Sequence, residues 1–287
     1  MSKIAVVTDC TAQFPNPSFH GKDLVRIFPF DIEINGTIVK EGAGLKTADL
    51  PLTIQDGSQT RLIIPSPAEI AEHFNALLKN YNELLVITNS ANLSSFYQNA
   101  IEAVKLIQGE TTVQVVNSQT IATGLGMIVQ AATEVISNGA NLTEADRHVR
   151  QLIPHVYTLF CTPCMKYLYN IGIIEYSQSF IGELLNLHPI FTMEEGHPKA
   201  ICKVRNFRHA QEYFQEFIEE YDDLIHISLL KGINTQGIDN RLLKLFVQEN
   251  FPDTPFSEHR INPFLGAIFG PKSLGLIILE RPYSLSG

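Results

Sequence analysis

The sequence predicts an α/β protein of two domains, with a parallel sheet flanked by helices in the first half and a mixed sheet in the second. Short apolar, β-branched runs alternate with stretches whose apolar residues recur at helical spacing, which is the order of repeated β-α-β units. The chain has 287 residues, which suits two domains of ordinary size. Its hydrophobic content of 45% provides a sizeable core and excludes intrinsic disorder.

The first half opens with a strand at residues 4–8, where the run IAVVT is too short for a helix and is typical of a buried parallel strand. A helix is predicted over residues 67–79, because Ile70 and Phe74 lie one turn apart and Ser66 with Glu69 has the pattern of a capping box. The same alternation continues. Strands are predicted at residues 25–34, 84–88 and 113–116, a hairpin at 32–39 around Asn35-Gly36, and helices at 94–107, 121–137 and 141–153.

The second half begins where this alternation breaks, at a proline and a strand-like run in residues 154–162. We therefore expect one domain at residues 1–155 and another at 156–287. Hairpin and crossover connections both occur in the second domain, so its sheet is expected to be mixed. Strands are predicted at residues 188–193, 199–205, 224–230 and 274–279, and helices at 165–170, 178–187, 207–221 and 240–250.

The composition argues against several classes of partner. Lys and Arg number 21 against 30 Asp and Glu, a net charge of −9, whereas binding to nucleic acid or to anionic membranes needs clustered basic residues. No apolar run approaches the roughly 20 residues that cross a bilayer, and the amino terminus lacks the pattern of a signal peptide. We therefore expect a cytoplasmic protein without stable membrane insertion, whose four cysteines are reduced.

The most informative polar turn is NSANLSSFYQ at residues 89–98. It leaves a buried strand and enters a helix predicted to begin at Ser94, so free amides, a hydroxyl N-cap and the positive end of the helix dipole would suit a carboxylate or a phosphate. The alternative is that Ser94 only caps its helix. Polar loops at residues 9–11, 65–67 and 117–118 also adjoin predicted strands, and they are expected to converge at the carboxyl ends of the strands, where α/β sheets bind ligands.

Other residues raise the alternative of a redox enzyme or a hydrolase. Cys161 and Cys164 have the spacing of a redox pair but lack the context of a thioredoxin motif. Asp9 follows the first strand as a phosphotransfer aspartate would, yet no second Asp stands at position 11 and no Walker or GxGxxG loop occurs. The nine His form neither an HxxxH nor an HExxH pattern. The sequence therefore predicts no catalytic residue, no metal site and no cofactor.

Six segments between Thr8 and Gly275 form an ordered set. They read TDCTAQFP, PSPAEIAEHF, NSANLSSFYQNA, VVNSQTIATGLGM, YLYNIGIIEYSQSFIGELLNLHPIF and PFLGAIFGPKSLG. Together they resemble the DegV family over nearly the whole chain. The resemblance implies two α/β domains that hold a long-chain fatty acid between them. It also implies a carrier that is not itself an enzyme and that presents the fatty acid to a kinase of the dihydroxyacetone-kinase type.

The resemblance further implies which residues contact the ligand. Ser94 matches the family's serine, and Pro65-Ser66 and Arg205 match as well. Leu62 replaces the family's carboxylate-binding threonine, Ile268 replaces a histidine, and Ile173 replaces an arginine. The candidate ligand-binding residues are Ser94, Ser90, Ser95, Ser66, Leu62, Arg205 and Ile268.

We therefore expect a non-enzymatic carrier that binds a long-chain fatty acid or related lipid in a cleft between the domains, with a fatty acid kinase as its implied partner. Three polar positions of the family pattern have become apolar in this chain. The alternative is consequently the same fold with a neutral or different apolar ligand, in which carboxylate recognition is lost.

Overall fold

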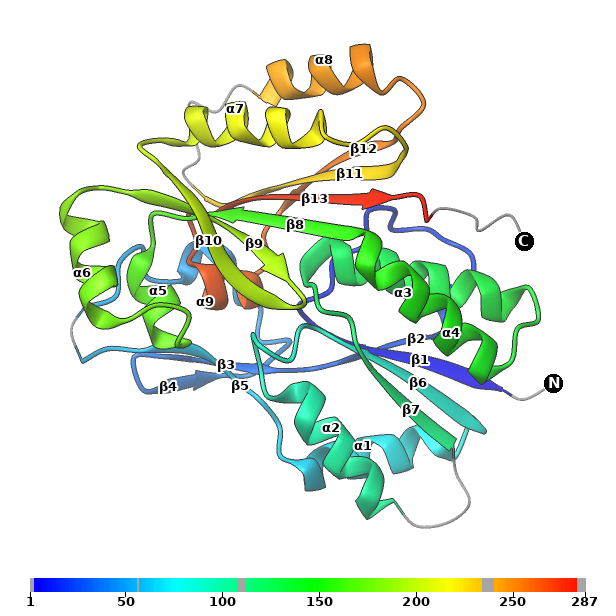
Figure 1. The fold of residues 1–287 in the computed structure, drawn as a ribbon. Helices are drawn as coiled ribbons and strands as arrows, with labels where there is room; N and C mark the ends of the chain where they lie inside the picture. Colours follow the sequence, from blue (N-terminus) through cyan, green and yellow to red (C-terminus); the bar gives the residue numbers. More distant parts are fainter. Residues whose placement is uncertain (1–2, 56, 108–111, 234–239, 283–287) are drawn as a thin grey trace. The chain divides into compact units, whose positions relative to one another are not determined.

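The computed structural model describes residues 3–55, 57–107, 112–233 and 240–282. The chain forms two compact units, and each is built from separate stretches of sequence (Figure 1). The first unit comprises residues 1–30, 63–154 and 195–197, and the second comprises residues 31–62, 155–194 and 198–287. Residues 31–62 therefore group with the C-terminal half of the chain.

The first unit contains a four-stranded sheet in the order β2-β1-β6-β7. Its strands are β1 (Ile4–Asp9), β2 (Val25–Phe28), β6 (Glu83–Thr88) and β7 (Thr112–Asn117). Every neighbouring pair is parallel, which confirms the predicted parallel sheet. All six residues of β1 are buried, as expected for a strand that is covered on both faces.

Four helices cover this sheet. They are α1 (Pro67–Leu78), α2 (Phe96–Leu106), α3 (Ala122–Ser137) and α4 (Leu142–Leu152). Helices α1 and α2 lie on one face, and α3 and α4 lie on the other (Figure 1). Helix α1 begins where the sequence predicts, because the Ser66 hydroxyl accepts from the Glu69 amide while the Glu69 carboxylate accepts from the Ser66 amide.

Helix α3 packs directly on the loop that follows β1. The Gln13 amide donates to the Ala122 carbonyl at 3.0 Å. A Cβ atom added to Gly126 would lie 2.0 Å from the Gln13 carbonyl oxygen, so no other residue allows this approach without movement of the backbone. This contact fixes the loop that begins at Asp9.

The second unit contains a six-stranded sheet in the order β10-β9-β8-β13-β11-β12. Its strands are β8 (Val156–Cys161), β9 (His188–Glu194), β10 (His197–Val204), β11 (Leu224–Lys231), β12 (Phe256–Arg260) and β13 (Leu274–Glu280). The β11–β12 pair is parallel, whereas β11–β13, β13–β8 and β8–β9 are antiparallel. The predicted mixed sheet is therefore confirmed. A small sheet in the order β4-β3-β5 contains β3 (Asp31–Ile34), β4 (Thr37–Val39) and β5 (Thr60–Ile63).

Five helices accompany these sheets. Among the described residues they are α5 (Met165–Asn170), α6 (Tyr176–Leu184), α7 (Phe207–Ile218), α8 (Asn240–Asn250) and α9 (Pro263–Phe269). Short 3-10 turns occur at Lys22–Leu24, Thr47–Asp49 and Ile153–His155. Phe214 of α7 and Leu243 of α8 pack in one apolar cluster with Ile227 of β11. On α9, the Phe269 ring stacks on Phe160 of β8 with 4.0 Å between centroids. Within the described residues, no helix combines the length and apolarity needed to cross a bilayer.

Some elements differ from the sequence-based expectation. The predicted strand at residues 25–34 is two strands, β2 and β3, separated at Pro29 and Phe30, because proline has no amide to donate to a ladder. Three short elements were not predicted: β5, β12 and α9. Helix α9 is buried at every residue from Leu265 to Phe269, so it shows no amphipathic pattern.

Two histidines and two serines form a polar cluster on β11 and β12. The Ser257 hydroxyl lies 2.8 Å from His226 Nε2, 2.9 Å from His259 Nε2 and 3.0 Å from Ser228 Oγ. Burial lowers the pKa of His226 to about 4, and the nearby His259 acts in the same direction. Burial also lowers the pKa of His259. Both imidazoles are therefore neutral at neutral pH.

We expect the Gly126→Ala variant to lower the free energy of unfolding by about 1–3 kcal/mol, because the new methyl group overlaps backbone atoms of Gln13. The matched control is Gly182→Ala in α6, where the nearest atoms to the new methyl group all belong to the Met165 side chain and the closest is its terminal Cε. Urea unfolding measures both. Equal costs for the two variants would contradict the role assigned to Gly126.

We also expect His226 to make stability depend on pH. An unfolded histidine takes up a proton near pH 6.5, whereas folded His226 resists protonation until about pH 4. The free energy of unfolding therefore falls as the pH is lowered from 6.5 to 4, because protons bind the unfolded chain more readily. The loss is at most about 3 kcal/mol. The His226→Gln variant should show a shallower decline in urea unfolding between pH 6.5 and 4. A slope identical to that of the wild type would refute the assignment.

Candidate ligand-binding site

The candidate site is organised around a buried carboxylate at the end of β1. Asp9 is fully buried. Its Oδ1 accepts from the Thr11 amide at 3.0 Å and from the Thr11 hydroxyl at 2.5 Å, and its Oδ2 accepts from the Asn89 amide at 2.8 Å. Burial raises the pKa of Asp9, and these hydrogen bonds oppose the rise. Asp9 thereby joins the loop after β1 to the loop after β6.

The serine turn after β6 is held by the same network. The Ser94 hydroxyl donates to Asn89 Oδ1 at 2.7 Å and accepts from the Phe96 amide at 3.4 Å. Helix α2 begins at Phe96, and its N-cap residue, Ser95, makes no side-chain cap bond. The predicted helix start at Ser94, with Ser94 as N-cap, is therefore wrong. The Ser94 hydroxyl binds Asn89 of the same turn instead, and Asn89 is oriented by Asp9 from the loop after β1.

Loops from three strands meet at this edge of the sheet. The Ala91 amide donates to Asn117 Oδ1 at 3.1 Å, which joins the loops after β6 and β7. The Ser90 amide donates to the Thr120 carbonyl at 2.9 Å. Asn99 of α2 donates through Nδ2 to the Pro65 carbonyl at 2.7 Å and brings the loop before α1 to the same helix. The predicted convergence of polar loops at the carboxyl ends of the strands is confirmed.

The four serines among the candidate residues belong to the first unit, but they differ in exposure. Ser90 is fully buried and its hydroxyl donates to the Gly196 carbonyl, also in the first unit, at 2.6 Å. Ser66 is exposed, and its hydroxyl donates to the Glu69 carboxylate at 2.7 Å. Ser95 is exposed, and Ser94 is half-buried. Ser94 therefore combines partial access from solvent with a hydroxyl that hydrogen bonds hold in place, whereas the hydroxyl of exposed Ser66 is paired with a carboxylate.

The other three candidate residues belong to the second unit. Leu62 packs against an apolar cluster of Ile32, Leu50 and Ala267. Ile268 follows Ala267 in α9 and is only 1% exposed. The structure thus brings Leu62 to the helix that carries Ile268. Arg205 is exposed and directly follows β10.

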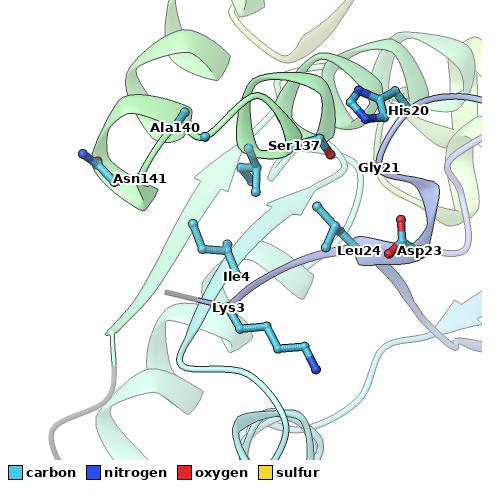
Figure 2. A pocket seen from close by; sticks show the side chains of 11 residues that line it. Lys3, Ile4, His20, Gly21, Asp23, Leu24, Ser137, Ala140 and Asn141 are labelled. Atoms are coloured by element: carbon cyan, nitrogen blue, oxygen red, sulfur yellow. The ribbon is translucent and has the colours of Figure 1, made fainter. Parts of the chain in front are cut away.

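The first unit also contains a cavity of about 490 Å³, shown in Figure 2. Its lining consists of Lys3, Ile4, His20, Gly21, Asp23, Leu24, Ile136, Ser137, Gly139, Ala140 and Asn141. Ile4 begins β1, whereas Asp9 ends it, so the cavity lies at the opposite end of this strand from the serine turn. None of the candidate ligand-binding residues lines it.

The second unit contains two smaller cavities of about 260 Å³ each beside α5. Ile54 and Lys166 line both. The adjoining helix α6 and the residue after it expose an unusual number of large apolar side chains, with Leu184 reaching 72% exposure. These side chains are Tyr176, Phe180, Ile181, Leu184 and Leu185. A concentration of this kind on a surface marks a place where an apolar partner or ligand binds.

The residues that raised the alternative of an enzyme are poorly placed for catalysis. Cys161 and Cys164 are free and buried, and burial raises the pKa of both thiols, which disfavours the reactive thiolate. Both carboxylate oxygens of Asp9 already accept hydrogen bonds inside the protein. In the part of the chain that the structure describes, no three His, Cys, Asp or Glu side chains gather as metal ligands.

We expect the Asp9→Asn variant to lower the free energy of unfolding by about 1–3 kcal/mol. Both carboxylate oxygens accept backbone amides, so the Nδ2 group of asparagine must face an amide donor and leave it unpaired. Chemical unfolding measures the loss. The control is Asp146→Asn, an aspartate on α4 whose carboxylate pairs with Arg150 at 2.9 Å and receives no hydrogen bond from a backbone amide among the bonds described. A cost no greater than that of the control would refute the role of Asp9.

Comparisons with known proteins agree with this architecture. The DegV family model, described as that of an uncharacterised DegV family protein, matches residues 3–281. A DegV domain-containing protein of Caldanaerobacter subterraneus subsp. tengcongensis is 27% identical, over 98% of this chain and 100% of the relative.

Two solved DegV family proteins, both described as fatty acid binding, share the fold. The one from Thermus thermophilus has a TM-score of 0.78 at 24% identity, covering 97% of this chain and 100% of its own. The one from Streptococcus agalactiae has a TM-score of 0.82 at 19% identity, covering 98% of this chain and 100% of its own. The chain belongs to the DegV family.

Proposed function

We propose that the protein is a non-enzymatic carrier that binds a long-chain fatty acid or a related lipid, with the polar head at Ser94 and the hydrocarbon tail sheltered between the two units. The observation that carries this proposal is the serine turn, where the buried Asp9–Asn89 pair holds a half-buried hydroxyl at the carboxyl edge of a parallel sheet. Fatty acid binding by the Thermus thermophilus and Streptococcus agalactiae relatives supports it.

The tail supplies most of the affinity in this proposal. Burying a methylene group contributes roughly 0.8 kcal/mol, so about 15 methylenes contribute on the order of 12 kcal/mol before the costs of ordering are subtracted. The exposed apolar side chains of α6 support an apolar ligand, because such surfaces are otherwise unfavourable in water. The head-group contact then sets the orientation of the ligand.

The side chains that could act as nucleophiles are poorly suited to modify a bound ligand. The buried thiols of Cys161 and Cys164 are poor nucleophiles, and Asp9 is enclosed by its hydrogen bonds. We infer that any covalent change of the ligand is made by a separate enzyme. We propose a kinase of the dihydroxyacetone-kinase type as that partner, because the family resemblance implies one.

Lipid extracted from the protein as purified tests the ligand class. We expect native mass spectrometry to show a long-chain fatty acid or related lipid bound to the folded chain. A protein that remains empty after expression, and that takes up no lipid on addition, would contradict the proposal.

Calorimetric titration with palmitic acid at pH 6 tests the head-group site. We expect Ser94→Ala to weaken binding roughly three- to tenfold, the range for loss of one neutral hydrogen bond. Ser95→Ala is the matched control, because Ser95 is the adjacent, exposed serine and makes no cap bond. Equal affinities for the wild type and both variants would remove Ser94 from the site.

Association with the kinase is a separate measurement. We expect the lipid-loaded protein to retain a dihydroxyacetone-kinase-type enzyme in a pull-down. Failure to associate in either loaded or empty form would leave the carrier role without this partner.

A further inference from the structure

The proton of the Ser94 hydroxyl is already used inside the protein. A serine hydroxyl has one proton to donate and two lone pairs that accept. Ser94 donates its proton to Asn89 Oδ1 at 2.7 Å, and one lone pair accepts from the Phe96 amide at 3.4 Å. The hydroxyl oxygen of half-buried Ser94 therefore offers a ligand one lone pair and no proton.

The direction of this hydrogen bond follows from the groups behind Asn89. The Nδ2 group of Asn89 lies 3.4 Å from both Asp9 Oδ1 and Thr11 Oγ1. The Thr11 hydroxyl gives its own proton to Asp9, so both atoms that face Nδ2 are acceptors. A reversed amide would place Oδ1 against these two acceptors. Asn89 consequently presents its oxygen to Ser94, and Ser94 must donate to it.

The charges around the turn also disfavour a negatively charged head group at Ser94. Residues 7–14, 88–98 and 117–123, which form the three converging loops, contain no Lys, Arg or His. Titratable groups near the turn include Asp9 inside the network and Cys10 and Tyr97 within the loops. Glu195 and His197 flank Gly196, whose carbonyl accepts from the Ser90 hydroxyl. His73 of α1 is separated from the turn by the rings of Phe28 and Phe96. Burial lowers the pKa of His73 and keeps it uncharged at neutral pH. A ligand carboxylate at Ser94 would thus meet no cation within these loops and would lie near a buried acid.

We propose that the head group bound at Ser94 is a hydrogen-bond donor, either a protonated carboxylic acid or a hydroxyl, and not a carboxylate. This inference rests on the proposed function, since it assigns the chemical class of the lipid head at the same site. The ligand group donates to the free lone pair of Ser94, and Asp9 acts as a positioning residue that orients Asn89.

Two ligands with the same tail test the inference: dodecanoic acid and 1-dodecanol, each titrated calorimetrically between pH 5.5 and 8.5. If only the protonated acid binds, its apparent Kd rises tenfold for each pH unit above the pKa of the free acid, by linkage. The Kd of 1-dodecanol should stay constant, and its constancy shows that the protein itself is unchanged across the range. An acid that binds with constant affinity and more tightly than the alcohol would overturn the inference.

The Asn89→Leu variant provides the reciprocal test. Leucine has nearly the shape of asparagine but no acceptor, so it releases the Ser94 proton for a ligand. We expect the preference for the acid over the alcohol at pH 8 to increase roughly 10- to 100-fold, the range for a hydrogen bond to a charged group. An unchanged preference in folded Asn89→Leu would contradict the proton assignment. If this variant does not fold, the wild-type pH series decides alone.

The outcomes also separate this inference from the proposed function. Binding of the acid with no pH dependence refutes the inference and leaves a fatty acid carrier. Binding of neither ligand at any pH refutes the inference, and if palmitic acid also fails to bind, the proposed function is refuted as well.

Discussion

The geometry of the candidate site depends on one buried carboxylate. Asp9 accepts the backbone amides of Thr11 and Asn89, which would otherwise be buried without partners in the loops that follow β1 and β6. A buried charge is unfavourable unless donors surround it, and here the fold supplies them from both loops. The same carboxylate orients the Asn89 side chain and, through it, the Ser94 hydroxyl. Removal of this carboxylate would leave the amides of Thr11 and Asn89 without their acceptor at this edge of the sheet.

Local signals made much of the fold predictable. The capping box of Ser66 and Glu69 spans three residues, so the start of α1 was predicted correctly. The buried run of β1 was likewise evident, because a strand covered on both faces is apolar throughout. Elements defined by their neighbours were missed. The residues of β12, FSEHR, are largely polar and become a strand only by pairing with β11, and α9 is buried on every side.

The site was predictable in outline and not in detail. Parallel strands place their carboxyl ends at one edge, which is why the polar loops could be expected to meet. The roles of individual serines depend on partners far along the chain. Asn89, which takes the Ser94 proton, is oriented by Asp9, which lies 80 residues away in sequence. Ser90 is buried against Gly196, 106 residues away. Sequence spacing contains no information about the Asp9 contact that orients Asn89, so an N-cap role for Ser94 was predicted where the structure shows a donor to Asn89.

The two edges of the six-stranded sheet have a consequence for the behaviour of the protein at high concentration. The edge strand β10 carries exposed Lys199 and Lys203, and the other edge strand, β12, carries exposed Glu258 and Arg260. Unpaired strand edges recruit other chains into aggregates, and charged side chains along them oppose this addition. Fibril growth by edge-to-edge pairing is therefore disfavoured at both edges of the sheet.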